Sequence, residues 1–326
     1  MPMPKREALQ NKNFRRSDIP DQSKRTILIT GANNGLGLQA ATALAKAGAQ
    51  ILLACRNQVT GNEALSQVLA VSSRTDHHLI PLDLADLSSV RAAAAQASSL
   101  VPQIDVLINN AGLMAIPQAR TVDGFEMQIG TNHFGHFVLT DALLPTLLAA
   151  PVPRVVSLAS IAHRQANMRL EDLNFDRRRY TRMGAYNQSK LANLLFSAEL
   201  ARRSDAARTQ LISVAAHPGV AATNLFDSMV PPIPGALTIT HLGLRAFGNS
   251  ETAGALSELY AAVMPDVRNN DYIGPTNLAG VRGPVRRSPR SSKARNADLA
   301  KGLWEKSVEL TGATFAQLQP KANSTK

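Results

Sequence analysis

Two residues one helical turn apart, Tyr186 and Lys190, carry side chains that could move a proton together. They stand in Ala185-Tyr-Asn-Gln-Ser-Lys190, within a segment whose apolar pattern continues as a helix, so both project from one face. A phenol has an ordinary pKa of about 10, and a cation held beside it favours the phenolate and lowers that pKa. The pair is a candidate general acid and base. An exposed surface pair would have the same spacing, so the hypothesis needs support from other residues.

A glycine-rich turn near the start of the chain could bind an anion. Residues 25–30 are typical of a short buried strand, and Gly31-Ala-Asn-Asn-Gly35-Leu-Gly37 follows before an Ala/Leu-rich helix over 38–47. Gly31 permits a tight exit from the strand, Gly35 lets the backbone approach a pyrophosphate, and Gly37 allows the helix to lie close to the sheet. The turn is therefore predicted to bind a dinucleotide, with a purely structural glycine turn as the alternative.

Further motifs follow in a fixed order. They are Asn109-Asn-Ala-Gly112, Asn132, Ser160 and Pro218-Gly219. Together with Thr30-Gly31-x-x-x-Gly35-x-Gly37 and Tyr186-x-x-x-Lys190, they resemble the signature set of the short-chain dehydrogenase/reductase superfamily. The likeness covers residues 24 to 315. Within the superfamily the chain is most similar to the retinol-dehydrogenase-like branch, judged by Ala54-Cys-Arg56, Asn132-His-Phe-Gly-His-Phe137, Ser160-Ile-Ala-His163, Tyr186-Asn-Gln-Ser-Lys-Leu-Ala-Asn193 and His217-Pro-Gly-Val220.

The resemblance implies roles for four catalytic residues. Tyr186 would transfer the proton, and Lys190 would lower the pKa of Tyr186 and bind the nicotinamide ribose. Ser160 would hold the reacting oxygen of the substrate, with Ser157 as the fallback. Asn132 would bend its helix and hold a water that relays protons from Lys190. The resemblance also implies a set of cofactor-binding residues, namely Gly31, Asn33, Asn34, Gly35, Leu36, Gly37, Arg56, Asp83, Leu84, Asn110, Ala111, Gly112, Tyr186, Lys190, Pro218, Gly219, Val220 and Thr223.

The end of the second predicted strand indicates which dinucleotide would bind. It reads Leu53-Ala-Cys-Arg56-Asn57, without the acidic residue that accepts the ribose 2′-hydroxyl of NAD. Arg56 could instead form charge-assisted hydrogen bonds with a 2′-phosphate, so we expect NADP(H). An arginine on an exposed loop is the alternative. Asp83 resembles the family residue near the adenine amino group, although an Asp there could also cap the next turn.

The elements that must position these residues alternate along the chain. Apolar runs predict strands at 26–30, 51–55, 79–82, 104–109, 154–158 and 211–216, and helices are expected near 36–47, 60–70, 87–99, 124–149, 184–203, 250–263 and 297–310. This alternation predicts an α/β fold, a single-domain Rossmann-type doubly wound parallel sheet with helices on both faces. The ligand crevice then lies at the carboxyl ends of the strands, where the order reverses after the first strand.

Length and composition agree with one domain. The chain has 326 residues, 44% of them hydrophobic, and its only cysteine, Cys55, excludes a disulfide framework and fits a reducing compartment. No stretch reaches 18 uninterrupted apolar residues and no secretion signal is evident, so we expect a cytoplasmic protein without stable membrane insertion. The expected organisation is a flexible basic tail over 1–24, an NADP-binding domain over 25–315 with a substrate lid at 224–249, and a C-terminal tail over 316–326.

The net charge of +11 is concentrated in two segments. Residues 1–25 hold seven basic and three acidic residues, and residues 273–297 hold six basic and no acidic residue. Because no aromatic residue lies among the basic residues at 282–295 for base stacking, we expect solvated flexible segments and no nucleic-acid site. Attraction of an anionic lipid or substrate is the minor alternative. The histidines lack metal-ligand spacing, so no metal is expected.

The expected function is that of an NADP(H)-dependent oxidoreductase that interconverts an alcohol and an aldehyde or ketone. Residues 224–249 combine apolar side chains with three prolines, which favours a lid over an apolar small molecule. One alternative is a catalytically silent NADP(H)-binding regulatory protein, and another is a basic nucleic-acid or membrane adaptor. A homo-oligomer is compatible with the sequence, which does not specify the oligomeric state.

Overall fold

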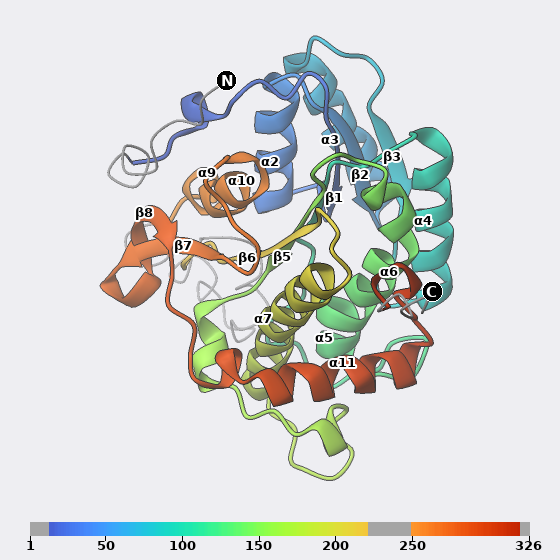
Figure 1. Cartoon of the computed structure of the whole chain (residues 1–326), viewed down its shortest axis with the longest axis vertical. Coiled ribbons are helices and arrows are strands. Elements are labelled where there is room, and N and C mark those ends of the chain that lie inside the picture. Colours follow the sequence, from blue (N-terminus) through green and yellow to red (C-terminus); the bar gives the residue numbers. More distant parts are fainter. Residues whose placement is uncertain (1–12, 221–248, 320–326) are drawn as a thin grey trace, which may run out of the picture.

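The computed structural model describes residues 13–220 and 249–319, and these contain one eight-stranded sheet (Figure 1). The spatial order is β3-β2-β1-β4-β5-β6-β7-β8, and all neighbours are parallel except β7 and β8. The order reverses at β1, which confirms the doubly wound α/β fold. The strands are β1 (Thr26–Thr30), β2 (Gln50–Cys55), β3 (His78–Pro81), β4 (Val106–Asn109), β5 (Arg154–Leu158), β6 (Ile212–Ala216), β7 (Tyr272–Asn277) and β8 (Arg282–Arg287).

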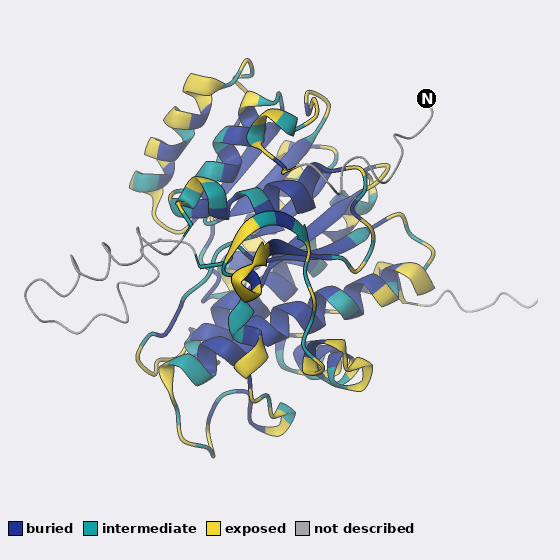
Figure 2. Cartoon of the chain, turned by 90° about the vertical axis from the view of Figure 1, so that its left-hand side faces the viewer, coloured by how far each residue is buried: buried dark blue, intermediate teal, exposed yellow. Residues whose placement is uncertain are grey.

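Helices cover both faces of the sheet and bury the central strands completely (Figure 2). One face carries α2 (Gly35–Lys46), α3 (Gln58–Val71) and α10 (Leu256–Val263), which follows the short α9 (Glu251–Gly254). The other face carries α4 (Leu87–Leu100), α6 (Gly135–Leu148) and α7 (Arg182–Ala206), with α11 (Ala297–Thr311) packed against α7. Because both faces are covered, the strands read as continuous apolar runs and could be predicted from the sequence.

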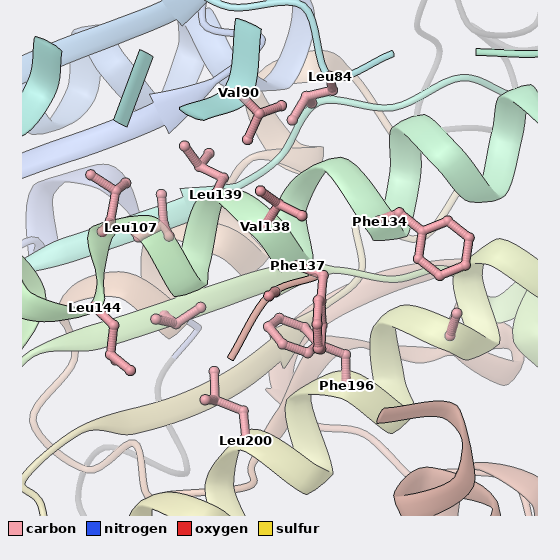
Figure 3. Packing of buried hydrophobic residues seen from close by; sticks show 14 of the residues in the cluster. Leu84, Val90, Leu107, Phe134, Phe137, Val138, Leu139, Leu144, Phe196 and Leu200 are labelled. Carbon is pink, nitrogen blue, oxygen red and sulfur yellow. The ribbon is translucent and has the colours of Figure 1, made fainter. Parts of the chain in front are cut away.

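One cluster of aromatic residues lies between α6, α7 and α11 and consists of Phe137, Phe196, Trp304 and Phe315. The Phe137 and Phe196 ring centroids lie 5.5 Å apart (Figure 3), and Trp304 lies 4.4 Å from Phe315 by the same measure. Trp304 is only 4% exposed, as expected of a packing anchor. This cluster packs α7 against α6 and α11, and α7 carries Tyr186 and Lys190.

The helix predicted over 124–149 is divided into three parts. The short α5 (Met127–Ile129) is followed by a π-helical segment, η2 (Gly130–Phe134), and then by α6. A π-helical segment inserts a residue into the helical repeat and changes the direction of neighbouring side chains. Asn132 lies in the middle of this segment, where the sequence predicted a local bend.

The chain ends are more ordered than expected. Phe14 is buried and packs edge-on against Tyr260 at 5.1 Å, so the prediction of a flexible tail up to residue 24 is wrong for residues 13–24. Leu318 is also buried, so residues 316–319 pack against the domain as well. The remainder of both predicted tails lies outside the described residues. Where the structure describes the chain, it contains no helix long and apolar enough to cross a membrane.

The basic segment at residues 282–295 is also not a flexible loop. Its first part is strand β8, which pairs with β7 and lies at an edge of the sheet. Arg287 forms a 3.0 Å ion pair with Asp271. The expectation of a flexible loop is therefore wrong for residues 282–287, which form a strand. Arg282, Arg287, Lys293 and Arg295 are exposed, as expected of a solvated segment. The predicted lid at 224–249 lies outside the described residues except for Asn249.

Candidate active site

A cleft of about 440 Å³ opens at the carboxyl ends of the central strands. It brings together most of the residues that the sequence nominated for a dinucleotide. The nominated residues that line it are Gly31, Asn33, Asn34, Gly35, Leu36, Gly37, Arg56, Asp83, Leu84, Asn110, Ala111, Gly112, Tyr186, Lys190 and Pro218. Gly219, Val220, Asn132 and Ser160 do not line the cleft, and Thr223 lies outside the described residues.

The glycine turn between β1 and α2 has the geometry expected of an anion-binding turn. Gly31 and Gly35 have φ of 64° and 51°, in the left-handed region that favours glycine. A Cβ at Gly37 would overlap the carbonyl oxygen of Gly31, so the turn and the first turn of α2 are in contact. Because α2 begins at Gly35, its first backbone N–H groups are directed to this end of the cleft.

The segment after β4 is joined to the glycine turn by hydrogen bonds. The Asn110 Nδ2 donates to the Thr30 carbonyl at 2.7 Å, and the backbone N–H groups of Asn110 and Ala111 both donate to the Thr30 hydroxyl at 3.0 Å. The Thr30 hydroxyl also lies 2.9 Å from Nε2 of His136. These contacts hold two neighbouring strand ends in one rigid wall of the cleft.

Tyr186 and Lys190 come from the N-terminal part of α7 and are both buried. Thr181 caps this helix by accepting the N–H of Gly184, which fixes where α7 begins. The Lys190 ammonium donates to the Leu158 carbonyl at 3.2 Å, at the end of β5. The Ser160 hydroxyl hydrogen-bonds the Tyr186 phenol. The structure therefore gathers Ser160, Tyr186 and Lys190 at one place beside the cleft.

Burial, and not the neighbouring ammonium, dominates the ionisation of this group. It raises the pKa of Tyr186 to about 12, and the hydrogen bond from Ser160 opposes that rise. Burial also lowers the pKa of Lys190 to about 8. Because the cost of removing the phenolate from water is the largest contribution, the pKa of Tyr186 lies above its ordinary value, and the lowering of this pKa by Lys190 stays a prediction.

Asn132 lies behind these residues and connects two walls of the site. Its side chain exchanges two hydrogen bonds with the backbone of Leu113, at 2.7 and 2.9 Å, and donates to the Ser189 hydroxyl at 2.9 Å. A Cβ at Gly112 would lie 3.1 Å from Oδ1 of Asn132 and 3.4 Å from Nζ of Lys190. Asn132 is thus next to Lys190, but its side-chain amide is fully engaged in holding the loop after β4.

The far end of the cleft is formed by the ends of β2 and β3. Arg56 is exposed and lines the cleft directly after β2. Asn57 also lines the cleft, and its side-chain oxygen caps α3 by accepting the N–H groups of Val59 and Thr60. Asp83 accepts the N–H of Ala85 at 2.9 Å, so its carboxylate also stabilises a turn.

Ser157, the alternative to Ser160 as the catalytic serine, lies within strand β5. It is buried, its hydroxyl has no partner among the residues described, and it pairs in register with Asn109 and Ala215. It does not line the cleft. Its position in the strand thus leaves Ser160 as the candidate catalytic hydroxyl.

Sequence reasoning missed two parts of the cleft. Leu113, Met114 and Ile116 form an apolar wall, which the apolar run after Gly112 could have indicated. Glu251, at the start of α9, lines the cleft beside the glycine turn, and a Cβ at Gly35 would lie 3.8 Å from its Oε1. Nothing in the sequence near Glu251 indicates this contact, because it depends on the tertiary fold. Within the described ranges no cluster of residues could hold a metal.

The fold and this cleft define a nicotinamide-dependent class of oxidoreductase, and comparison with known proteins agrees. A family model described as short chain dehydrogenase matches residues 25–232. The chain therefore belongs to the short-chain dehydrogenase family, in its retinol-dehydrogenase-like branch.

Similar proteins extend over most of the chain. It is 37% identical to retinol dehydrogenase 12 of Mus musculus, over 88% of this chain and 86% of the relative. It is 36% identical to polyprenol dehydrogenase of Mus musculus, over 92% and 88%. A solved structure from Mycobacterium paratuberculosis is 42% identical and covers 93% of this chain and 99% of its own, with a TM-score of 0.78.

Proposed function

We propose that this protein is an NADP(H)-dependent oxidoreductase that interconverts an alcohol and an aldehyde or ketone on a small apolar molecule. One observation carries the proposal. A buried tyrosine, hydrogen-bonded to a serine and one helical turn from a buried lysine, lines the same cleft as a glycine turn at a helix N-terminus. Membership of the short-chain dehydrogenase family supports alcohol and carbonyl chemistry at this site.

The residues of the cleft fit a dinucleotide. The glycine turn and the start of α2 would hold the diphosphate, because backbone N–H groups and the helix dipole favour an anion there. Asp83 and the Asn110–Gly112 segment would hold the adenosine side, Lys190 the ribose next to the nicotinamide, and Pro218, Gly219, Val220 and Thr223 the nicotinamide amide. When bound, the nicotinamide supplies or accepts the hydride.

Arg56 supports a preference for NADP(H). Its guanidinium lines the cleft at the end of β2, where NAD-binding enzymes of this architecture place a carboxylate. A guanidinium forms paired, charge-assisted hydrogen bonds with the oxygens of a phosphate, whereas the 2′-hydroxyl of NAD offers one uncharged oxygen and no second acceptor.

The proton is handled by the chain's own residues. With a pKa of about 12, Tyr186 is protonated at neutral pH and can donate from its hydroxyl to the oxygen of a bound carbonyl. Ser160 hydrogen-bonds the same oxygen and stabilises the negative charge that develops on it. Lys190, with a pKa of about 8, is mainly protonated at pH 7 and stabilises the phenolate left behind. Asn132 holds the loop over Gly112 beside Lys190.

The substrate class follows from the wall of the cleft. Leu113, Met114 and Ile116 present an apolar surface near Tyr186, and Met114 packs with the Tyr186 ring. The relatives named for retinol and polyprenol act on long apolar alcohols by those names, which supports an apolar alcohol or its aldehyde for this chain.

The test is turnover of cofactor with a panel of lipophilic alcohols, aldehydes and ketones. We expect NADPH to be consumed with carbonyl substrates and NADP⁺ to be reduced with the matching alcohols. A regulatory protein that only senses the cofactor would bind NADPH without consuming it under any member of the panel. That outcome, with tight binding retained, would reject the enzymatic function.

A further inference from the structure

We propose that residues 288–293, named the clamp segment, hold the catalytic serine in place, and that His163 is the positioning residue through which they act. The inference rests on the proposed function, in which Ser160 contacts the substrate. It gives a role to the basic segment that the sequence left unexplained.

Ser160 follows Ala159 after the end of β5 and caps the short 3₁₀ helix η3 (Ile161–Gln165). Its own carbonyl accepts two hydrogen bonds from His163, one from the backbone N–H at 3.2 Å and one from ring Nδ1 at 2.6 Å. The ring contact therefore fixes the peptide group of the residue whose hydroxyl meets Tyr186. His163 is fully buried, so this contact does not compete with water.

The other ring nitrogen of His163 connects Ser160 to the clamp segment. The Ser291 backbone N–H lies 3.3 Å from Nε2. A backbone N–H can only donate, so Nε2 must be the unprotonated nitrogen and Nδ1 must carry the hydrogen that Ser160 accepts. Burial also lowers the pKa of His163, which favours the neutral ring that this arrangement requires. One imidazole thus joins the catalytic strand end to residue 291.

Two further contacts hold the same turn, and a third holds the neighbouring chain after β6. The Lys293 ammonium donates to the Ala166 carbonyl at 2.6 Å, just past the end of η3. Arg164 donates to the Ala279 carbonyl at 2.8 Å. The Ser288 hydroxyl lies 3.0 Å from Nε2 of His217, at the end of β6. The turn over 160–166 is therefore held at His163, Arg164 and Ala166 by residues 279–293.

The clamp segment is itself anchored to the sheet. Arg290 donates to the carbonyls of Asn270 and Asp271, at 2.9 and 3.3 Å, and its guanidinium lies 5.9 Å from the centre of the Tyr272 ring. Ala294 is buried directly after the segment. Arg290 and Lys293 are thus hydrogen-bond donors to backbone carbonyls, which is a structural role distinct from attraction of a distant anion.

Position matters at Ser160 because the hydroxyl must meet both Tyr186 and the reacting oxygen. A displacement of about 1 Å in such a group can reduce turnover about 100-fold. Loosening the clamp should therefore reduce kcat while leaving the cofactor in place, since the glycine turn and Arg56 belong to other strand ends. Loss of the contacts around His163 should therefore lower kcat more than it weakens cofactor binding.

A matched pair of variants distinguishes loss of a clamp contact from loss of a positive charge alone. Lys293→Met and Arg295→Met each remove one positive charge from the same region. Of the two side chains, Lys293 donates a hydrogen bond to the turn, whereas Arg295 is exposed. We expect Lys293→Met to lower kcat at least about fivefold and to speed amide hydrogen exchange over residues 160–166, with the Kd for NADPH unchanged. Arg295→Met should leave all three values unchanged.

A second pair tests His163 directly. His163→Asn keeps a donor at the position of Nδ1, whereas His163→Leu removes it. We expect His163→Leu to lose about 10- to 100-fold in kcat with unchanged NADPH affinity, and His163→Asn to recover most of that loss.

The outcomes are distinguishable from failure of the proposed function. Hydrogen exchange and NADPH binding need no turnover, so they report on the clamp even if no substrate is found. Equal effects of Lys293→Met and Arg295→Met, unchanged exchange over 160–166 in Lys293→Met, or loss of NADPH affinity equal to the loss of kcat in His163→Leu would each overturn the clamp. Absence of turnover in the unaltered protein would instead reject the proposed oxidoreductase.

Discussion

The Lys190 ammonium lies 5.7 Å from the centre of the Tyr186 ring, one turn further along α7, and both side chains are buried. Burial moves the two pKa values in opposite directions, to about 12 for the phenol and about 8 for the amine. Each group is thereby pushed toward its neutral form. When Tyr186 becomes a phenolate, the positive charge of Lys190 stabilises it strongly, because little water is present to screen the interaction.

Replacing Tyr186 with Phe removes the hydroxyl and keeps the ring. We expect kcat to fall about 100-fold or more, since general acid and base catalysis contributes about that factor, with the Kd for NADPH changed little. Steady-state kinetics and fluorescence titration with NADPH measure the two quantities. Tyr260→Phe is the control, because it removes a hydroxyl bonded to Asp266 at 2.7 Å away from the cleft. Undiminished turnover in Tyr186→Phe would refute the assignment.

Replacing Arg56 with Ala should reduce the preference for NADP(H) over NAD(H). Hydrogen bonds to a charged group contribute about 1.5–3 kcal/mol, which corresponds to a loss of about 10- to 100-fold in the ratio of kcat/KM for the two cofactors. Arg179→Ala is the control, because it removes the same charge from an exposed position that does not line the cleft. A full NADP(H) preference in Arg56→Ala would show that the guanidinium does not read the 2′-phosphate.

Adding a methyl group at Gly37 should damage the cofactor end of the cleft. The Cβ of Gly37→Ala would overlap the Gly31 carbonyl and the Asn110 side chain, so the glycine turn must shift. We expect NADPH binding to weaken at least about tenfold, together with a lower Tm. In Gly302→Ala the new Cβ meets only the flexible end of Leu170, so this control should keep NADPH affinity. Unchanged affinity in Gly37→Ala would contradict a rigid turn.

Glu258 predicts an unusual dependence of stability on pH. It is 1% exposed, neither carboxylate oxygen has a partner in the part of the chain that is described, and burial raises its pKa from 4.5 to about 8. Between these values the folded chain binds a proton that the unfolded chain releases, so the free energy of unfolding falls as pH rises from about 4.5 to 8.

We therefore expect Glu258→Gln to be more stable than the unaltered protein at pH 8, by an amount on the order of a few kcal/mol, and to differ much less at pH 5. Urea denaturation at both pH values measures the difference. Glu199 is the control, since it is equally buried but paired with Arg202 and Arg203, so Glu199→Gln should destabilise at pH 8. The same stability difference at both pH values for Glu258→Gln would reject the raised pKa.

The central strands could be predicted from the sequence because each is buried on both faces and reads as an apolar run. Strand β1 has the predicted bounds and β6 differs from its prediction by one residue at its start. Strands β7 and β8 were not predicted. Gly274 and Pro275 interrupt any apolar run in β7, and the arginines interrupt it in β8, which is the strand at the edge of the sheet. An edge strand needs no continuous apolar sequence, so periodicity does not detect it.

The residues of the candidate site likewise include some that could be predicted from the sequence and some that could not. Gly31, Tyr186 and Lys190 could be nominated because local geometry and chemistry restrict the residue types there. The contact of Ser160 with His163, and of His163 with Ser291, spans 128 residues and leaves no local pattern. The pKa of Tyr186 could not be predicted either, because spacing shows a neighbouring cation but not the extent of burial.

The two outermost strands of the sheet, β3 and β8, have a consequence for behaviour in crowded solution. Strand β3 ends with Pro81, and β8 combines Gly283 and Pro284 with three arginines. A proline offers no N–H to an incoming strand, and a row of guanidinium groups repels an identical row on another molecule. Neither border of the sheet can readily template growth by a neighbouring copy, so these residues protect the protein against fibrillar aggregation.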